Sequence, residues 1–347
     1  MSSGGGERID LPGAPAIEGL AFRAFDPATD YPVMAALTDA VNRHDGVDWL
    51  PTAESLRHDW QLNDGFDPPR DVLIAQVGDD VVGAVDVDWR VRSGDRVFHD
   101  LTPMVRPDWR RRGIGTVLRG WAERRVITGV AGGEMGPVGA AHILTSFADL
   151  EVPGTVAFAE GAGYAVEGYG VMMLRALSDP IPDFPFPPGL EVRPVAPEQH
   201  RQIWDADTEA FRDHRDPGVR TEADYLRWFT NPEVDTALWI VAWDGDDVAG
   251  SVWNVVFHDE NERLGVRRGW LEHVSVRRPW RRRGLASALI AQSMRRLRDL
   301  GLQEAALGAD AANLSGAIRV YEALGFRRAR TAAHFQKAFP NGEAGQS

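Results

Sequence analysis

"VRRPWRRRGLASALIA", from Val276 to Ala291, joins three consecutive arginines and a glycine to the start of an apolar-periodic run. A second stretch, "VRPDWRRRGIGTVLRG", has the same organisation 171 residues earlier, from Val105 to Gly120. Over the first fourteen positions, eight are identical: one valine, four arginines, one tryptophan, one glycine and one leucine. Self-similarity at a fixed spacing is typical of a repeated fold. The sequence therefore predicts two copies of one architecture, each built around an arginine-glycine loop.

The repeat extends beyond the loop. "VLIAQVGDDVVGAVDVDW" from Val72 matches "LWIVAWDGDDVAGSVWNVVF" from Leu238, and each reads as two strands joined by a Gly-Asp-Asp turn. A helical pattern precedes each hairpin, and a third strand leads from it into the loop. A helix, a strand, a helix and a last strand follow. We expect an α/β fold class with a mixed sheet in each half and the loop at a strand-to-helix junction.

A proline-rich segment separates the two copies. "SDPIPDFPFPPG", from Ser178 to Gly189, has five prolines in twelve residues and can form neither a helix nor a central strand. Each side of it has roughly the size of one domain. The predicted organisation is a lead-in at 1–18, an N-terminal domain at 19–178, a linker at 179–188, a C-terminal domain at 189–340 and a tail at 341–347.

The composition excludes several classes of protein. The chain has no cysteine, which removes disulfides, thiolate metal sites and covalent cysteine intermediates. Its net charge of −13 at pH 7 opposes nucleic-acid binding, which needs an accumulated positive face. No apolar stretch is long enough to span a bilayer, and the N-terminal residues lack the pattern of a secretory signal. We expect a cytoplasmic protein that uses no metal and binds neither nucleic acid nor membrane.

The loop is suited to an anion. In the second copy the pattern is Arg281, Gly284 and Ala286 between a strand and a helix N-terminus, where amides are unpaired and the helix dipole is positive. A glycine lets the backbone approach a ligand, and arginines bind phosphate with charge-assisted hydrogen bonds. A surface turn with solvated arginines would explain one copy, but two matched copies argue against it. The spacings of the Rossmann and Walker A loops are absent.

These features resemble the GNAT superfamily of acyl-CoA-dependent N-acyltransferases. The resemblance rests on "RRRGLA" and "RRRGIG", on the strand before each, and on "NLSGAIRVYEALGF" from Asn313 to Phe326. It covers both halves, so the chain is similar to tandem GNAT proteins, among them the mycothiol synthase-like acetyltransferases. The resemblance implies two GNAT domains, acetyl-CoA as co-substrate, and direct attack by the primary amine of a small molecule.

The resemblance also implies which residues bind acetyl-CoA. Loop amides would hold the pyrophosphate, and the backbone of the preceding strand would pair with the pantetheine arm. Asn313 would contact that arm, although a helix N-cap explains an asparagine there equally well. The expected binding residues are Val274, Ser275, Val276, Arg281, Arg282, Arg283, Gly284, Leu285, Ala286 and Asn313, and in the first half Arg110, Arg111, Arg112, Gly113, Ile114 and Gly115.

The tyrosine that protonates the departing thiolate in this family matches Tyr321, four residues before Gly325. A core aromatic on an amphipathic helix is the alternative. The equivalent position of the first half, four residues before Gly163, is Ala159. The resemblance therefore assigns catalysis to the C-terminal domain and makes the N-terminal domain a degenerate copy that still has an intact loop.

Glu272 is the candidate carboxylate on the strand before the loop. Strand alternation would put it on the same face as Val274 and Val276, with His273 on the opposite face and ranked lower. Relatives often place the glutamate two residues earlier, where this chain has Trp270. Glu272 is therefore a candidate base, a group that orients the substrate ammonium, or a plain strand carboxylate.

The acceptor amine is not specified by the sequence. An acidic segment could hold a cation, although a solvated acidic helix is the simpler interpretation. A non-catalytic acyl-CoA-binding protein and a nucleic-acid-binding module are the competing functions. Two GNAT folds in one chain imitate a homodimer, so we expect a monomer. The acidic segment includes Asp213, His214, Asp216, Glu222 and Asp224.

Overall fold

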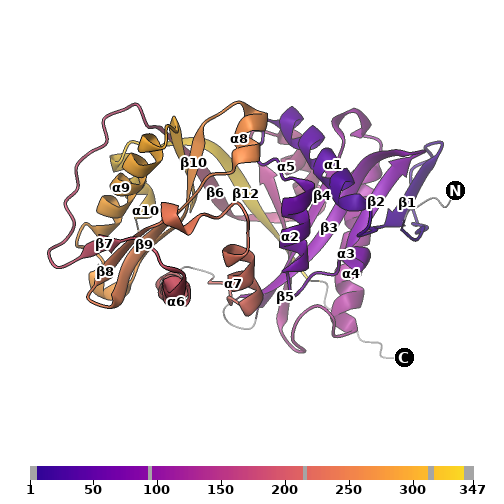
Figure 1. Ribbon diagram of the computed structural model, residues 1–347. Coiled ribbons are helices and arrows are strands. Elements are labelled where there is room, and N and C mark those ends of the chain that lie inside the picture. The colour runs from indigo at the N-terminus through magenta and orange to yellow at the C-terminus, as the bar shows by residue number, and fades with distance from the viewer. Residues whose placement is uncertain (1–5, 93–95, 214–216, 312–315, 340–347) are drawn as a thin grey trace. The chain divides into compact units, whose positions relative to one another are not determined.

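A computed structural model describes residues 6–92, 96–213, 217–311 and 316–339 (Figure 1). The chain divides into two compact units. The first comprises Met1–Ala148, Val152–Glu167 and His334–Ser347, and the second comprises Asp149–Glu151 and Gly168–Ala333. Within the described residues, no helix combines the length and apolar character needed to cross a membrane.

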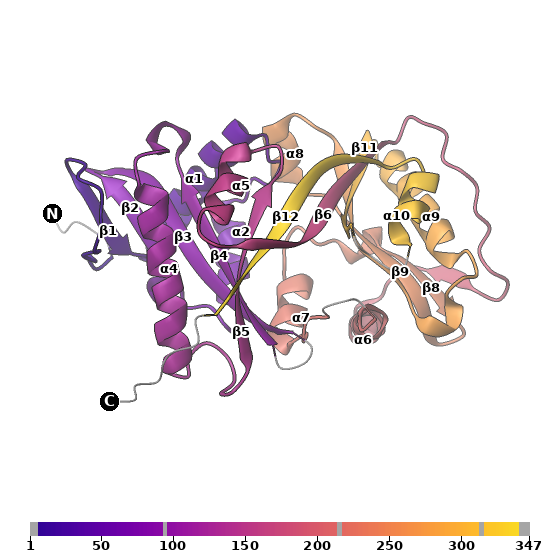
Figure 2. The same cartoon turned by 180° about the vertical axis from the view of Figure 1, so that it is seen from behind.

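The first unit is a sheet covered by helices on both faces. Strands β1 to β4 form an antiparallel series, and β5 joins β4 in parallel. Helices α1 and α2 cover one face of β2 to β4 (Figure 1), and α4 covers the other (Figure 2). The elements are β1 (Leu20–Ala24), α1 (Asp30–Asp45), α2 (Ala53–Gln61), α3 (Pro68–Asp71), β2 (Val72–Val77), β3 (Asp80–Arg92), β4 (Arg96–Val105), α4 (Ile114–Ala131), β5 (Ala141–Asp149) and α5 (Pro153–Glu160).

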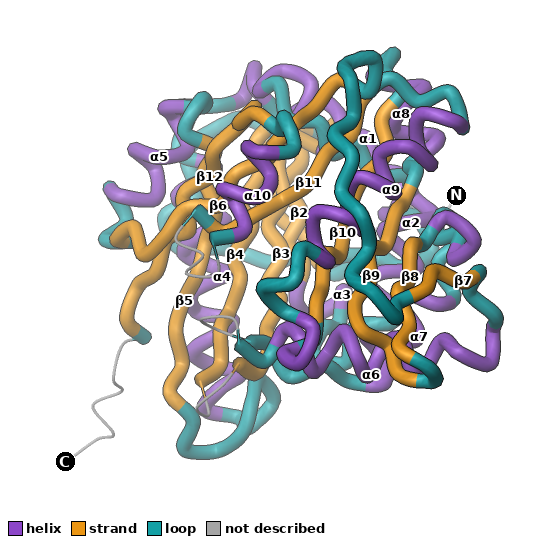
Figure 3. The backbone as a smooth tube through the Cα atoms, turned by 90° about the vertical axis from the view of Figure 1, so that its left-hand side faces the viewer, coloured by secondary structure: helices purple, strands orange, loops and turns teal. Residues whose placement is uncertain are grey.

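The second unit repeats this plan. Its neighbouring strands β8, β9 and β10 are antiparallel and lie side by side (Figure 3), and α9 and α6 cover opposite faces of them. The elements of this part of the chain are β6 (Ala165–Ala176), β7 (Glu191–Arg193), α6 (His200–Phe211), α7 (Glu222–Phe229), β8 (Ile240–Asp244), β9 (Asp247–Val255), α8 (His258–Leu264), β10 (Arg268–Val276), α9 (Leu285–Asp299), β11 (Glu304–Asp310), α10 (Ala317–Ala323) and β12 (Arg327–Ala338).

The predicted hairpins and the loop helix are confirmed. Strands β2 and β3 pair as a hairpin, as do β8 and β9. In α9, the apolar residues spaced three and four apart are all at most 1% exposed, because they face the sheet. Gly301 follows the helix with a positive φ of 82°. The buried residues of this face are Leu285, Leu289, Ile290, Met294 and Leu297.

Strand β6 comes from the first repeat of the sequence but completes the sheet of the second unit. It pairs antiparallel with β11 from Gly170 to Ala176. Its side chains Val171 and Met173, and the following Leu177, are at most 3% exposed and belong to the core that surrounds α9. The segment before the proline-rich stretch is therefore part of the second unit.

We predict that a fragment of residues 168–338 has a higher thermal midpoint than a fragment of residues 189–338. The shorter fragment lacks β6, so the edge of β11 is uncovered. It also loses about 1.5–3 kcal/mol of folding free energy for each large apolar side chain that β6 buries. Thermal unfolding followed by circular dichroism measures the difference. Equal midpoints would contradict the assignment of β6 to the core of the second unit.

Candidate active site

Both arginine loops have the same unusual backbone. Arg282 and Arg111 have φ of 60° and 63°, and they are the non-glycine residues with positive φ in the described part of the chain. Gly284 and Gly113, with φ of 84° and 87°, are the N-caps of α9 and α4. The left-handed backbone conformation costs an arginine about 1–2 kcal/mol. Since both loops adopt it, other contacts or function must maintain it.

The amides of the second loop are available to a ligand. None of the backbone N–H groups from Arg282 to Ala286 donates a hydrogen bond to a described residue, and a Cβ added to Gly284 would meet no atom within 4 Å. Unpaired amides at a helix N-terminus, next to two left-handed residues, form a concave site for an anion. Leu285 is buried and fixes the start of the helix, whereas the side chains of Arg282 and Arg283 are exposed.

The first arginine of each loop is an anchor. The Arg281 guanidinium donates to the Val276 carbonyl oxygen at 2.8 Å, to the Ala210 carbonyl oxygen at 3.0 Å and to the Asp213 carboxylate at 2.5 Å. Arg110 donates to the Val105 carbonyl oxygen and, through two nitrogens, to Asp45 at 2.7 and 2.8 Å. These side chains fasten the loop to the preceding strand and to the first helix of the unit.

Sequence reasoning missed these anchoring carboxylates. Asp213 lies 68 residues before Arg281, and Asp45 lies 65 residues before Arg110, so no local pattern joins them. The bonds to Arg278 and Arg281 hold the pKa of Asp213 well below its usual range. Each half has an aspartate at a similar distance before the first loop arginine. An alignment of the two halves could have revealed this shared Asp–Arg pair.

Strand β10 has one open edge beside the loop. It pairs with β9 up to Val276, whereas its described parallel pairing with β11 covers only Arg268 to Trp270. The pairing with β11 ends at that point, so backbone groups near Val274 can pair with an extended ligand, whereas the Val276 carbonyl oxygen already accepts from Arg281. The Ser275 hydroxyl lies 3.2 Å from that of Ser251 and is buried on the opposite face.

Glu272 lies where the regular alternation of β10 is interrupted. The pairing of β10 with β9 shifts register between Leu271 and His273, so Glu272 is the extra residue of a β-bulge. Leu271 consequently packs with Val274 and Val276 against the α9 core. Glu272 itself is exposed, and desolvation by the surrounding protein raises the pKa of its carboxyl.

Tyr321 lies on α10, close to the helix that follows the loop. Its ring is 8% exposed and belongs to the same core as Leu285, and it meets Phe326 edge-on with centroids 6.2 Å apart. The hydroxyl has no hydrogen-bond partner among the described residues. Desolvation raises the pKa of Tyr321 to about 12, which keeps it protonated at neutral pH. Asn313 lies outside the described residues.

The first half differs at the positions of the two candidate catalytic residues. Ala159 replaces the tyrosine and is buried. Leu101, 171 residues before Glu272, is 2% exposed in the core and matches Leu271 in its strand pairing, so the extra residue Glu272 has no counterpart on β4. Its loop residues Arg111 and Arg112 are exposed, and Ile114 is buried like Leu285. Gly115 lies against the Phe158 ring, where a Cβ would come within 3.5 Å.

His273, which sequence reasoning ranked low, has a side chain held by hydrogen bonding to a buried carboxylate. His273 follows the bulge on β10, and its Nδ1 lies 2.8 Å from Asp207 Oδ2. Arg220 donates to the same oxygen at 2.7 Å. The Asp207 side chain is fully buried on α6. The 66 residues between Asp207 and His273 explain why no sequence motif revealed the pair.

The acidic segment is largely neutralised by arginines. Asp213 pairs with the loop arginines, Glu222 pairs with Arg201, and Asp224 accepts from the Thr221 amide to cap α7. His214 and Asp216 lie outside the described residues. A free acidic surface for a cation is therefore not formed by these three carboxylates.

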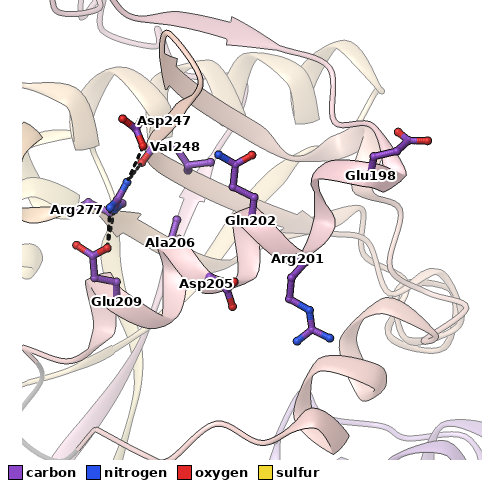
Figure 4. A pocket seen from close by; sticks show the side chains of 9 residues that line it. All are labelled: Glu198, Arg201, Gln202, Asp205, Ala206, Glu209, Asp247, Val248 and Arg277. Carbon is purple, nitrogen blue, oxygen red and sulfur yellow. Dashed lines mark hydrogen bonds and ion pairs between the residues drawn. The ribbon is translucent and has the colours of Figure 1, made fainter.

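A hollow of about 450 Å³ lies between α6 and the turn that leads into β9 (Figure 4). Arg277 crosses it and contacts Glu209 on one side and the Val248 carbonyl oxygen on the other. None of the residues predicted to bind acetyl-CoA lines this hollow, which is walled mainly by charged side chains.

Comparisons with known proteins identify the family of the chain. Residues 200–326 match the acetyltransferase (GNAT) family. A mycothiol acetyltransferase of Geodermatophilus obscurus is 29% identical over 306 residues, which cover 87% of this chain and 92% of that protein. A mycothiol acetyltransferase of Salinispora arenicola is 32% identical over 238 residues, covering 67% of this chain and 71% of that protein.

Solved structures show the same fold over both halves. A GCN5-related N-acetyltransferase from Sphaerobacter thermophilus is 25% identical with a TM-score of 0.71, covering 96% of this chain and 98% of that one. A tandem GNAT protein from the clavulanic acid biosynthesis pathway has a TM-score of 0.65 at 17% identity, covering 93% and 100%. The predicted mixed α/β tandem fold is confirmed.

The chain belongs to the GNAT acetyltransferase family. It is an N-acetyltransferase, and acetyl-CoA-dependent N-acetylation is the general reaction of the family.

We predict that Asp213→Asn weakens acetyl-CoA binding by about tenfold, because the anchor of Arg281 loses its charge and the loop amides are no longer pre-organised. Isothermal titration measures the affinity. The matched control is Asp246→Asn on the exposed β8–β9 turn, which should bind like the wild type. Unchanged affinity in Asp213→Asn would contradict the anchoring role.

Proposed function

We propose that this enzyme transfers the acetyl group of acetyl-CoA to a primary amine of a small molecule by direct attack in a ternary complex, and that the second half carries out the chemistry. The observation that carries this proposal is that the left-handed arginine loop of the second half is followed by the buried Tyr321, whereas the first half has Ala159 at the position of that tyrosine.

Acetyl-CoA binding is assigned to backbone groups. The amides from Arg282 to Ala286 bind the pyrophosphate, with the exposed Arg282 and Arg283 adding charge. The open edge of β10 near Val274 pairs with the pantetheine arm, which directs the thioester toward the bulge at Glu272.

The amine then attacks the thioester carbonyl, and the carbon–sulfur bond of the tetrahedral intermediate breaks. The Tyr321 hydroxyl gives a proton to the departing thiolate, which suits a group whose pKa is raised to about 12 by desolvation. Glu272 accepts a proton from the amine or orients its ammonium group.

The first half is proposed to bind acetyl-CoA without transferring the acetyl group. Its loop has the same left-handed arginine and the same Asp–Arg anchor, which supports binding. Ala159 and Leu101 lack groups that could exchange a proton, which argues against chemistry there.

A narrower proposal takes its support from the relatives. Several proteins similar over most of the chain are named mycothiol acetyltransferase, so we propose the acceptor of such enzymes as the first amine to test. Thiol release from acetyl-CoA across a panel of amines distinguishes this acceptor from others. Acetyl-CoA binding with no release for any amine would favour a non-catalytic binding protein.

We predict that Tyr321→Phe lowers kcat by 10²–10⁴-fold and leaves the affinity for acetyl-CoA unchanged, because only the proton donor is lost. With the tyrosine protonated below its raised pKa of about 12, its ionisation should impose no alkaline fall in wild-type kcat up to pH 10. Thiol release measured from pH 6 to 10 checks both points. Phe326→Leu is the control for packing, and a fully active Tyr321→Phe enzyme would contradict the role.

Substituting valine for the loop glycine of each half tests the roles of the two halves separately. Gly284→Val should abolish both tight acetyl-CoA binding to the second half and turnover, since a β-branched residue is strained at φ of 84°. Gly113→Val should remove one binding event in calorimetry and spare turnover. Loss of turnover only in Gly113→Val would reverse the assignment of the halves.

A further inference from the structure

We propose that His273 accepts the proton of the incoming ammonium group and that Asp207 positions its ring. This rests on the proposed function. The structure assigns the task to His273 because it flanks the bulge of β10, its ring is locked, and one of its nitrogens is held by a buried carboxylate.

The ring has one fixed orientation. It stacks on Trp253 with centroids 4.3 Å apart and planes 9° apart, and the edge-on Trp228 ring lies at 4.9 Å. Phe211 contacts it at 5.5 Å. Packing on these sides leaves 16% of the His273 side chain exposed. A side chain restricted in this way presents the same atom to a ligand at each turnover.

Hydrogen bonding fixes which nitrogen can accept a proton. Asp207 Oδ2 accepts from Nδ1–H at 2.8 Å. Burial alone would raise the pKa of Asp207, but His273 and Arg220 hold it below its usual value, so the carboxylate stays ionised and selects this tautomer. Nε2 then carries the lone pair, and it has no hydrogen-bond partner among the described residues.

Few charged groups surround His273 in the described part of the chain. They are Asp207 on α6, Arg220 before α7, and the adjacent Glu272 on β10. Aromatic rings of α6, α7 and β9 supply its remaining contacts. Because Arg220 shares the Asp207 oxygen, the carboxylate orients the ring without acting as a second proton acceptor.

The first half has no histidine at this position. Thr102, which is 171 residues before His273, takes its place and donates its hydroxyl hydrogen to Asp86. At this position, as at Tyr321, the second half has a side chain that can exchange a proton where the first half has a different residue. A histidine that stands at this strand position in the half with Tyr321, and not in the other half, fits a role in the reaction better than a role in the shared fold.

The proton balance is complete with these groups. An ammonium group gives one proton to Nε2, and the resulting amine forms a nitrogen–carbon bond with the thioester carbonyl. The carbon–sulfur bond breaks, and the thiolate takes the Tyr321 proton while the tyrosine recovers one from the new amide nitrogen. His273 releases its proton to water, so each turnover yields one amide, one thiol and one proton.

The test compares His273→Gln with the wild-type enzyme over pH and over amines of graded pKa. We expect kcat/KM at pH 7 to fall about 100-fold or more for a strongly basic amine, and the deficit to shrink as pH rises or amine pKa falls, because a neutral amine needs no acceptor. Asp207→Asn should show the same pattern with a smaller deficit. Affinity for acetyl-CoA should be unchanged.

Two control variants show whether the effect is specific to His273. His258→Gln on exposed α8 should behave as the wild type, and Glu272→Gln should raise KM without flattening the pH profile. His273→Gln with wild-type activity, or with one uniform deficit at every pH and amine pKa, would overturn the inference while leaving the acetyltransferase intact. Absence of thiol release by the wild-type enzyme with every amine would instead overturn the proposed function, and the inference with it.

Discussion

The left-handed arginine is the constraint around which each unit is arranged. Arg282 and Arg111 hold a conformation that an L-residue avoids, and the glycine two residues later repeats the positive φ at the helix N-cap. The Asp–Arg anchors fasten the loop to the first helix, and Leu285 or Ile114 buries the first turn of the following helix. The strand, the helix and the loop amides are therefore fixed together before a ligand binds.

The two loops share one backbone conformation and one Asp–Arg anchor, whereas the residues around them differ, and only the second half is proposed to perform chemistry. A buried tyrosine, a bulged strand carboxylate and a histidine–aspartate pair all lie in the second unit. In the first unit alanine and threonine stand at the positions of the tyrosine and the histidine. Both units therefore have the arginine loop, and the groups proposed to exchange protons lie in the second unit.

Local patterns predicted the hairpins, the buried face of α9 and the loop, since each is set by residues close in sequence. Local patterns did not reveal the bulge at Glu272, which inserts one residue and interrupts the alternation used to place that side chain. They also could not reveal the Asp207–His273 contact or the pairing of β6 with β11, which join residues far apart in the chain.

The central claim is that the loop amides bind the pyrophosphate of acetyl-CoA. Hydrogen exchange of the backbone amides from Arg282 to Ala286, measured with and without CoA, tests it most directly. These amides have no described partner, so they should exchange quickly in the free protein and at least tenfold more slowly when CoA is bound. Slowing elsewhere in the second unit with no change in these amides would contradict the account.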